Sequence, residues 1–166
     1  MDRAQEANDA LSRVTLDAQR RSIPIEIVPR PPATSLEHAA SLLGIPAARL
    51  IKTLVLKRAD GSFVFALIPG DRSMSWPKLR KALAVNKLAL PDADQALEVT
   101  GYRRGTITPF GSRNALPVVI DRATLESHPG HPITLGSGDP NHALFVQPQD
   151  LVSGFGAIVE DISVPL

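Results

Sequence analysis

One lysine is unusual because it occupies an otherwise apolar, strand-like segment. Residues 51–57 alternate in the manner of a β-strand, and Lys52 shares a face with Leu54 and Leu56. Burying an ammonium group without a partner costs several kcal/mol. Lys52 is therefore expected to line a cleft, to pair with an acid or to meet an anionic ligand. The alternative is that it lies at the end of the strand and extends its ammonium group into water.

A loop rich in glycine lies at residues 101–111. It combines glycines with a hydroxyl and a proline: Gly101, Gly105, Thr106, Pro109 and Gly111. The backbone N–H groups of such a loop can hold a phosphate or a developing oxyanion. Neither a Walker A loop nor a dinucleotide-binding fingerprint occurs in the sequence. The alternative is a purely structural connection to the next strand.

A second polar loop lies at residues 136–142. Its candidate ligand-binding residues are Gly136, Ser137, Gly138, Asp139 and His142. Ser137 is not in the GxSxG turn of serine hydrolases, so the sequence does not predict a serine nucleophile. The chain has no cysteine, which excludes disulfides, thiolate nucleophiles and cysteine-ligated zinc. His128 and His131 lie close together without an evident third ligand, so no metal site is expected and a solvated turn is the simpler interpretation.

Positive charges cluster in one predicted helix. Lys78, Arg80 and Lys81 could follow an RNA backbone, with Arg103 and Arg104 as a second candidate patch. The formal net charge is +1, from 18 Lys and Arg against 17 Asp and Glu, so RNA binding requires a local cluster rather than a globally basic surface. The alternative is an ordinary solvated helix face.

The rest of the sequence provides elements to position these residues. The chain has 166 residues, 43% of them hydrophobic, which predicts a single domain over 1–166 with an N-terminal helical segment at 1–22. Helices are expected at residues 8–21, 35–43, 75–85 and 93–98. Strands are expected at residues 23–28, 51–57, 62–68, 116–121, 133–135, 143–147 and 156–162, and a short element of unspecified type is expected at 87–90.

The segments on either side of Asp60 and Gly61 predict a hairpin in the middle of a sheet, because both are apolar on both faces. Strands and helices mix without a regular βαβ rhythm. This predicts an α+β (mixed α/β) fold with a central mixed, barrel-like β-sheet surrounded by helices. No apolar stretch reaches the roughly 18 residues of a membrane span. No secretory signal is evident, and the lack of cysteine fits a reducing compartment, so the expected location is cytoplasmic.

The order of these motifs resembles the YbaK family. The resemblance is carried by residues 51–55, 100–102, 105–111 and 116–121, and it extends over nearly the whole chain. That family comprises free-standing aminoacyl-tRNA deacylases and is similar to the editing insertion domain of bacterial prolyl-tRNA synthetases. The resemblance implies a YbaK-like fold and trans-editing hydrolysis of the ester that joins a wrong amino acid to the 3′ end of tRNA. It implies no cofactor.

The resemblance also implies roles for individual residues. The catalytic set it implies is Lys52, Thr53, Gly105 and Thr106. The substrate-binding set is Gly101, Tyr102, Pro109, Gly111, Gly136, Ser137, Gly138, Asp139 and His142. The tRNA-binding set is Lys78, Arg80 and Lys81. The implied partners are mischarged tRNA and a prolyl-tRNA synthetase.

Two departures from the family affect specificity. Residues 139–143 replace a more basic, glycine-bearing stretch of members specific for cysteinyl-tRNA, and Thr106 stands where a smaller residue is frequent. The substrate is therefore Cys-tRNA(Pro) or a related mischarged tRNA, and the amino acid is left open.

An aminoacyl ester is already activated, so positioning and oxyanion stabilisation can suffice for its hydrolysis. Lys52 would anchor the polar part of the substrate or the terminal phosphate, and Lys52→Ala would keep the fold and abolish deacylation. The attacking group is left open between water, a ribose hydroxyl and the substrate's own side chain. The alternative function is a non-catalytic aminoacyl-binding or tRNA-binding module that partners a prolyl-tRNA synthetase.

Overall fold

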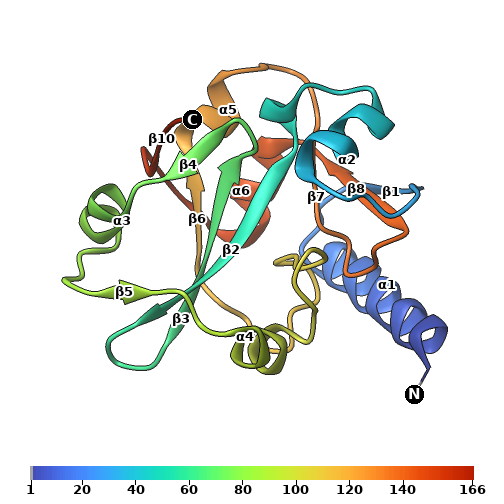
Figure 1. Ribbon diagram of the computed structural model, residues 1–166, viewed down its shortest axis with the longest axis horizontal. Coiled ribbons are helices and arrows are strands. Elements are labelled where there is room, and N and C mark those ends of the chain that lie inside the picture. Colours follow the sequence, from blue (N-terminus) through green and yellow to red (C-terminus); the bar gives the residue numbers. More distant parts are fainter. Residues whose placement is uncertain (1) are drawn as a thin grey trace.

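Helices and strands alternate irregularly along the chain in the computed structural model, which describes residues 2–166 (Figure 1). The helices are α1 (Arg3–Arg20), α2 (Leu36–Leu43), α3 (Trp76–Leu83), α4 (Ala93–Thr100), α5 (Arg122–Glu126) and α6 (Pro148–Phe155), with a 3-10 turn, η1 (Ala47–Arg49). The strands are β1 (Ile25–Pro29), β2 (Ile51–Arg58), β3 (Phe63–Pro69), β4 (Arg72–Met74), β5 (Leu88–Ala89), β6 (Val118–Asp121), β7 (Ile133–Leu135), β8 (His142–Val146), β9 (Ile158–Glu160) and β10 (Ser163–Pro165).

The strands form separate sheets. The five-stranded sheet has the order β5-β2-β3-β6-β9 and is mixed, because β2 and β3 are antiparallel while β3, β6 and β9 are parallel. A three-stranded antiparallel sheet has the order β1-β8-β7, and β10 pairs with β4. The predicted mixed α+β class is confirmed. Within residues 2–166 no closed barrel forms, because β1, β7 and β8 pair with one another rather than extending the central sheet.

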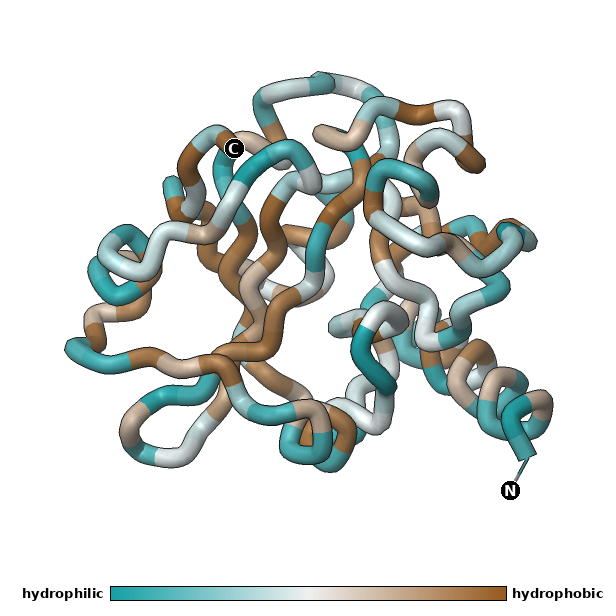
Figure 2. The backbone as a smooth tube through the Cα atoms, in the orientation of Figure 1, coloured by the Kyte–Doolittle hydropathy of each residue, from teal (hydrophilic) through white to brown (hydrophobic). Residues whose placement is uncertain are grey.

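The β2–β3 hairpin lies in the middle of the five-stranded sheet, as its apolar sequence predicts. One face carries Val55 and Phe65 into a hydrophobic cluster shared with α1 and the β1-β8-β7 sheet. The opposite face carries Leu56 and Val64 into a second cluster that includes Leu79 of α3. Figure 2 shows the hydrophobic colouring concentrated along these central strands. Burial on both faces explains why neither strand shows a simple apolar–polar alternation.

Local capping signals set several element boundaries. The Ser35 side chain accepts a hydrogen bond from the His38 amide at 3.0 Å and begins α2, and Gly44 ends that helix at φ +65°. Ser75 caps α3 in the same way. The predicted strand at 156–162 is shortened to β9, and β10 begins beyond it. Between the two strands the buried Asp121 carboxylate accepts a hydrogen bond from the Ile162 amide at 3.0 Å.

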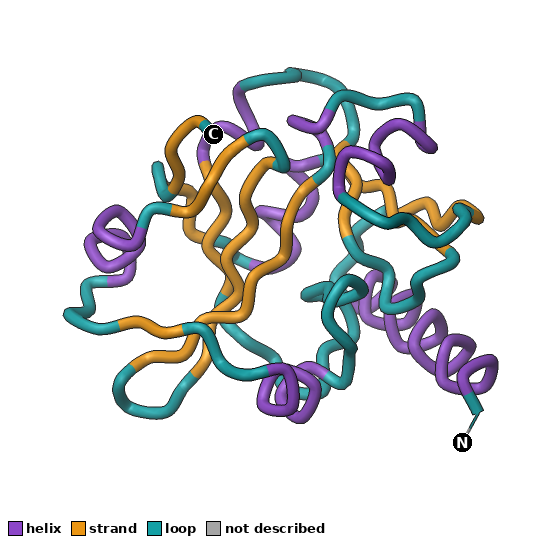
Figure 3. The backbone as a smooth tube through the Cα atoms, in the orientation of Figure 1, coloured by secondary structure: helices purple, strands orange, loops and turns teal. Residues whose placement is uncertain are grey.

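Helix α1 begins earlier than predicted and supports the 101–111 loop. It starts at Arg3 because the Asp2 side chain caps it, accepting from the Gln5 amide at 2.8 Å. Asp17 of α1 accepts a hydrogen bond from the Gly111 amide at 2.8 Å. Figure 3 shows the segment between α4 and β6 as irregular chain. Within residues 2–166 no helix has both the length and the apolar character needed to cross a membrane.

Candidate functional site

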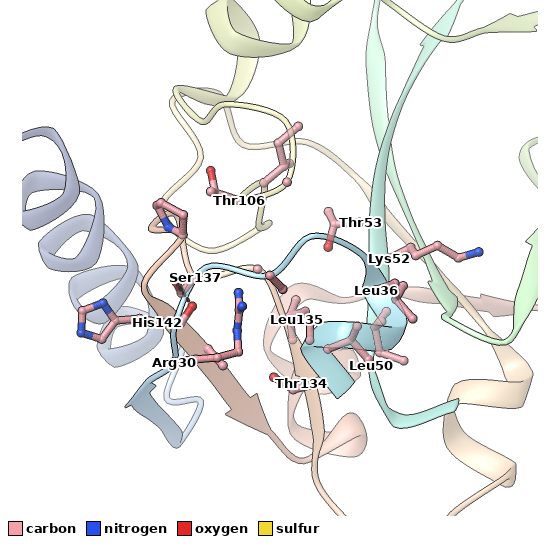
Figure 4. Close-up of a pocket in the computed structure, with 18 of the residues that line it drawn as sticks. Arg30, Leu36, Leu50, Lys52, Thr53, Thr106, Thr134, Leu135, Ser137 and His142 are labelled. Carbon is pink, nitrogen blue, oxygen red and sulfur yellow. Dashed lines mark hydrogen bonds between the residues drawn. The ribbon is translucent and has the colours of Figure 1, made fainter. Parts of the chain in front are cut away.

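A cavity of about 580 Å³ opens between α2, the start of β2 and the β7–β8 end of the three-stranded sheet. Its walls come from α2, the start of β2, residues 104–107, and the loop that follows β7 (Figure 4). This volume falls within the range of about 300–1,000 Å³ typical of small-molecule sites. The cavity can therefore hold a group the size of an aminoacyl nucleoside.

The two glycine-containing loops meet at this cavity. The Gly138 amide donates a hydrogen bond to the Thr106 carbonyl at 2.9 Å. A Cβ placed on Gly136 would lie 2.2 Å from the Ile107 carbonyl oxygen, so only glycine allows the two backbones to approach so closely. Residues 105–107 and 136–138 thus form one continuous surface, called here the glycine wall.

Gly105 lines the cavity and is exposed. Its φ of +90° is a conformation that favours glycine, and a Cβ at this position would meet no atom within 4 Å. Among residues 2–166, no hydrogen-bond partner is recorded for its N–H group. An unpaired amide that borders a cavity can donate to a carbonyl oxygen or an oxyanion.

Three hydroxyl groups around the cavity are hydrogen-bonded to main-chain carbonyl groups. Ser137 Oγ lies 2.8 Å from the His142 carbonyl oxygen, Thr134 Oγ1 donates to the Leu144 carbonyl, and Thr106 Oγ1 donates to the Arg103 carbonyl. Thr53 differs from them. Its Oγ1 is buried and has no hydrogen-bond partner within residues 2–166. Figure 4 shows the Thr53 side chain directed toward the cavity interior.

Lys52 borders the cavity through the start of β2, but its ammonium group points away from the glycine wall (Figure 4). The Nζ atom donates a hydrogen bond to the backbone carbonyl of Arg72. Partial burial lowers the pKa of this ammonium group, and the nearby carboxylates of Asp71 and Glu37 oppose that shift. The predicted contact of Lys52 with substrate stays a prediction.

Asp139 and His142 contact each other beside the cavity. His142 Nδ1 lies within hydrogen-bond distance of Asp139 Oδ2, and the His142 ring points away from Thr53 and Thr106 (Figure 4). The Asp139 side chain is 3% exposed, and its other oxygen, Oδ1, has no partner within residues 2–166. The His142 imidazole is therefore not aimed at the cavity interior.

Five residues predicted to bind substrate do not line the cavity: Gly101, Tyr102, Pro109, Gly111 and Gly138. Tyr102 is 2% exposed and donates a hydrogen bond from its hydroxyl to the Phe110 carbonyl at 2.7 Å, and burial raises its pKa. The Arg13 guanidinium lies 5.0 Å from the Tyr102 ring centroid. These contacts give the loop a fixed support, so the structure does not place these five residues next to a ligand.

The predicted tRNA-binding residues of α3 lie across the central hairpin from α2 (Figure 1). Lys78 Nζ is 2.9 Å from Asp161 Oδ2, and this hydrogen bond lowers the pKa of the Asp161 carboxyl group. Arg80 and Lys81 are on the same helix, and none of the three residues lines the cavity. Their predicted contact with tRNA stays a prediction.

Arg30 lines the cavity although no sequence motif marks it. It stands in a polar, proline-rich stretch between β1 and α2, where only the succession of Pro31 and Pro32 indicated a shaped connection. The apolar side chains of Leu36, Ala39 and Leu43 of α2 also line the cavity. Within residues 2–166, His, Cys, Asp and Glu side chains form no group of three or more that could hold a metal ion.

Comparison with known sequences is consistent with this geometry. The family profile of the aminoacyl-tRNA editing domain matches residues 30–153, so this chain belongs to that family. It is 36% identical over 88 residues to the proline--tRNA ligase of Thermosipho africanus, covering 53% of this chain and 16% of the ligase. It is 38% identical over 98 residues to the proline--tRNA ligase of Citrifermentans bemidjiense, covering 59% of this chain and 17% of the ligase. The chain thus matches only a small part of these ligases.

Solved structures share the fold. The crystal structure of the hypothetical protein APE2540 has a TM-score of 0.83 at 28% identity, covering 92% of this chain and 99% of that one. A protein described as a proposed trans-editing enzyme for prolyl tRNA synthetase has a TM-score of 0.84 at 22% identity, covering 93% of this chain and 97% of that one. The YbaK-like mixed fold expected from the sequence is confirmed by these matches.

Proposed function

We propose that this protein, acting as one editing domain over residues 1–166, hydrolyses the ester bond of a mischarged aminoacyl-tRNA in trans. The substrate class is Cys-tRNA(Pro) or a related mischarged tRNA. Mischarged tRNA and a prolyl-tRNA synthetase are the proposed partners, and the cytoplasm is the proposed location. The observation that carries this proposal is the unpaired Gly105 amide on a glycine wall beside a cavity of about 580 Å³.

The chemistry requires little from side chains. A nucleophile adds to the ester carbonyl, the carbonyl oxygen becomes negatively charged, and the C–O bond to the terminal ribose then breaks. When water attacks, its hydroxyl ends on the amino acid and its proton ends on the ribose oxygen. A backbone amide stabilises the negatively charged oxygen of this intermediate, because the donor is already in place when the oxyanion forms. Gly105 is the proposed donor, with Thr106 holding the loop through its bond to the Arg103 carbonyl.

Thr53 is the proposed hydroxyl contact to substrate. A buried hydroxyl without a hydrogen-bond partner lowers stability. A ligand that bonds to the Thr53 hydroxyl would supply the missing partner. The neighbouring Lys52 would act by moving. Its ammonium group leaves the Arg72 carbonyl, a neutral acceptor, and turns toward the substrate at the cost of one hydrogen bond, about 1 kcal/mol.

A panel of mischarged tRNAs tests the proposal. Purified protein is incubated with each aminoacyl-tRNA, and release of the free amino acid is followed against the spontaneous rate. We expect accelerated release from at least one mischarged tRNA(Pro), without added metal or cofactor. Tight binding of the panel without release would support the non-catalytic binding module instead. Neither binding nor release from any member would contradict both functions.

A further inference from the structure

Arginine side chains flank the cavity on two of its sides. Arg30 comes from the segment between β1 and α2, and Arg104 precedes Gly105 in the glycine wall. Figure 4 shows the Arg30 guanidinium directed into the space between Ser137 and Leu135. Arg30 is half-buried and Arg104 is exposed. The Arg30 guanidinium therefore reaches into the cavity, and Arg104 borders it.

The backbone of Arg30 is held firmly at this place. Its amide donates a hydrogen bond to the Asn141 carbonyl at 2.8 Å, and the preceding Pro29 pairs with His142 across the β1–β8 ladder. Pro31 and Pro32 follow directly and restrict the chain. Arg30 is thus fixed to the same loop that supplies half of the glycine wall.

Both guanidinium groups keep most of their donors free. Arg30 Nη1 donates to the Pro31 carbonyl at 2.7 Å, and Arg104 Nη2 donates to the Pro91 carbonyl at 3.2 Å. A guanidinium has five N–H donors. In the part of the chain from residue 2 to residue 166, no carboxylate forms an ion pair with either arginine.

Three cations outside the cavity lining illustrate the paired case. Lys78 is paired with Asp161, Arg103 with Glu6 at 3.4 Å, and Arg122 with Glu160 at 3.7 Å. A pair of uncompensated arginines beside a cavity is suited to an anion, and the planar guanidinium matches phosphate oxygens in a bidentate manner.

We propose that Arg30 and Arg104 bind the phosphate groups of the last nucleotides at the tRNA 3′ end. This inference rests on the proposed function, because an aminoacyl group in the cavity brings the phosphate on the 5′ side of its ribose to the cavity entrance. The arginines, rather than Lys52 or the α3 helix, then hold the RNA end. The proposal assigns the RNA a path over the segment between β1 and α2.

Binding of an uncharged RNA tests the arginines without any need for catalysis. The probe is a fluorescent acceptor-stem minihelix ending in CCA, and its Kd is measured by anisotropy over a range of KCl concentrations. We expect Arg30→Ala and Arg104→Ala each to lower the slope of log Kd against log salt by about 0.7, as expected for one lost contact to a single-stranded phosphate. Arg122→Ala, an exposed arginine that does not line the cavity, leaves the slope unchanged. An unchanged slope in the double variant overturns the proposal.

A variant of the α3 cluster tests the alternative that the RNA end binds α3. If Lys78→Ala, Arg80→Ala and Lys81→Ala together reduce the slope while Arg30→Ala and Arg104→Ala do not, the RNA end lies on α3 and the inference is wrong. Arg30→Lys retains the charge but not the planar fork, so we expect it to recover only part of the wild-type affinity.

Kinetics separate this inference from the proposed function. With aminoacyl minihelix as substrate, Arg30→Ala raises KM about tenfold, the effect of one charged hydrogen bond. With 3′-aminoacyl-adenosine, which has no phosphate, Arg30→Ala and wild type have the same kcat/KM. An equal loss on both substrates contradicts a phosphate contact. If the wild type releases no amino acid from any substrate, the proposed function fails, and the anisotropy experiment still decides whether the arginines bind RNA.

Discussion

The two faces of β2 differ in how their polar groups are satisfied. On the cavity face, which carries Thr53, the Thr53 hydroxyl has no partner within residues 2–166. On the far face, which carries Lys52, the polar groups around Lys52 are joined, whereas Arg58 Nε at the end of the strand has no partner within residues 2–166. Lys52 donates to the Arg72 carbonyl, and the Ser163 hydroxyl bridges Arg72 Nε and Asp121 Oδ2 at 2.6 Å each. A buried polar group without a partner beside a cavity marks a place for a ligand, whereas a connected network marks the framework.

The largest expected effect on stability lies on the far face. Asp121 is 1% exposed and accepts hydrogen bonds from the Ile162 amide and the Ser163 hydroxyl. Asp121→Ala leaves these donors and Arg72 without their acceptor, so we expect the free energy of unfolding to fall by about 3–5 kcal/mol in urea denaturation. Glu160→Ala, which removes only an exposed ion pair, should cost less than about 1 kcal/mol. Equal losses in the two variants would show that the far-face network does not support the fold.

The next effect lies on the cavity face. Gly136→Ala places a methyl group against the Ile107 carbonyl, so the glycine wall must separate. We expect a loss of about 1–3 kcal/mol in unfolding free energy and loss of deacylation by the folded protein. The control is Gly154→Ala in α6, where a Cβ would lie 2.2 Å from the Ile23 side chain. That variant should lose stability but keep its activity, and full activity in Gly136→Ala would exclude the wall from the mechanism.

A matched pair of glycines separates the proposed catalytic role of the Gly105 amide from the effect of backbone strain. Gly105 and Gly61 have φ values of +90° and +88°, and a Cβ at either position meets nothing within 4 Å. Alanine at each should cost about 1–2 kcal/mol through backbone strain alone. Only Gly105→Ala is expected to slow deacylation, by about tenfold or more, because the strained loop shifts its amide. Similar rates in the two variants would remove Gly105 from catalysis.

A smaller effect on stability is expected at Thr53. Thr53→Val removes a buried hydroxyl that has no partner, so the unfolding free energy should rise by about 1 kcal/mol. Deacylation should fall, while Thr53→Ser, which keeps the hydroxyl, should retain it. Steady-state kinetics on one mischarged tRNA make the comparison. If Thr53→Val and Thr53→Ser have equal kcat/KM, the hydroxyl does not contact substrate.

The smallest expected change in stability is a pH dependence at Lys52. Because burial lowers its folded-state pKa below the ordinary value of 10.5, the unfolded chain binds more protons between the two values. The contribution of Lys52 to stability therefore rises with pH through that window and is lowest at neutral pH. Lys52→Met should lack this rise when urea unfolding is followed as the pH increases toward 10.5.

The activity of Lys52→Ala provides the second measurement. We expect a folded protein without deacylation, and normal turnover would remove Lys52 from the mechanism.

An unfolding profile against pH that is the same in Lys52→Met and wild type would contradict the assigned burial effect.

Local signals predicted much of the fold. The Ser35 cap, the Gly44 terminus and the Asp60–Gly61 turn act within a few residues, so the elements they bound were predicted closely. The division into three sheets was not predicted, because the pairing of β1 with β8 joins segments more than 100 residues apart. Strand β4 is short and contains Arg72, which gave no strand pattern and only becomes extended by pairing with β10.

The sequence predicted the path of the backbone around the site better than the directions of the side chains. The order of the motifs brought the glycine loops and the start of β2 to one cavity, since strands and glycine turns fix the path of the chain. The direction of the Lys52 side chain depends on a carbonyl supplied by Arg72, and that of Arg30 depends on the β1–β8 ladder. Neither dependence is visible in a local sequence pattern.

The close contact at Gly136 limits how this protein could change its selectivity. Since the two loops touch through main-chain atoms, exchanging side chains there does little to reshape the chamber without breaking it. The opposite boundary is made by Leu36, Ala39 and Leu43, whose side chains can be enlarged or trimmed independently. Redesign in the laboratory would accordingly act through about two turns of helix while the backbone of the proposed active site stays constant.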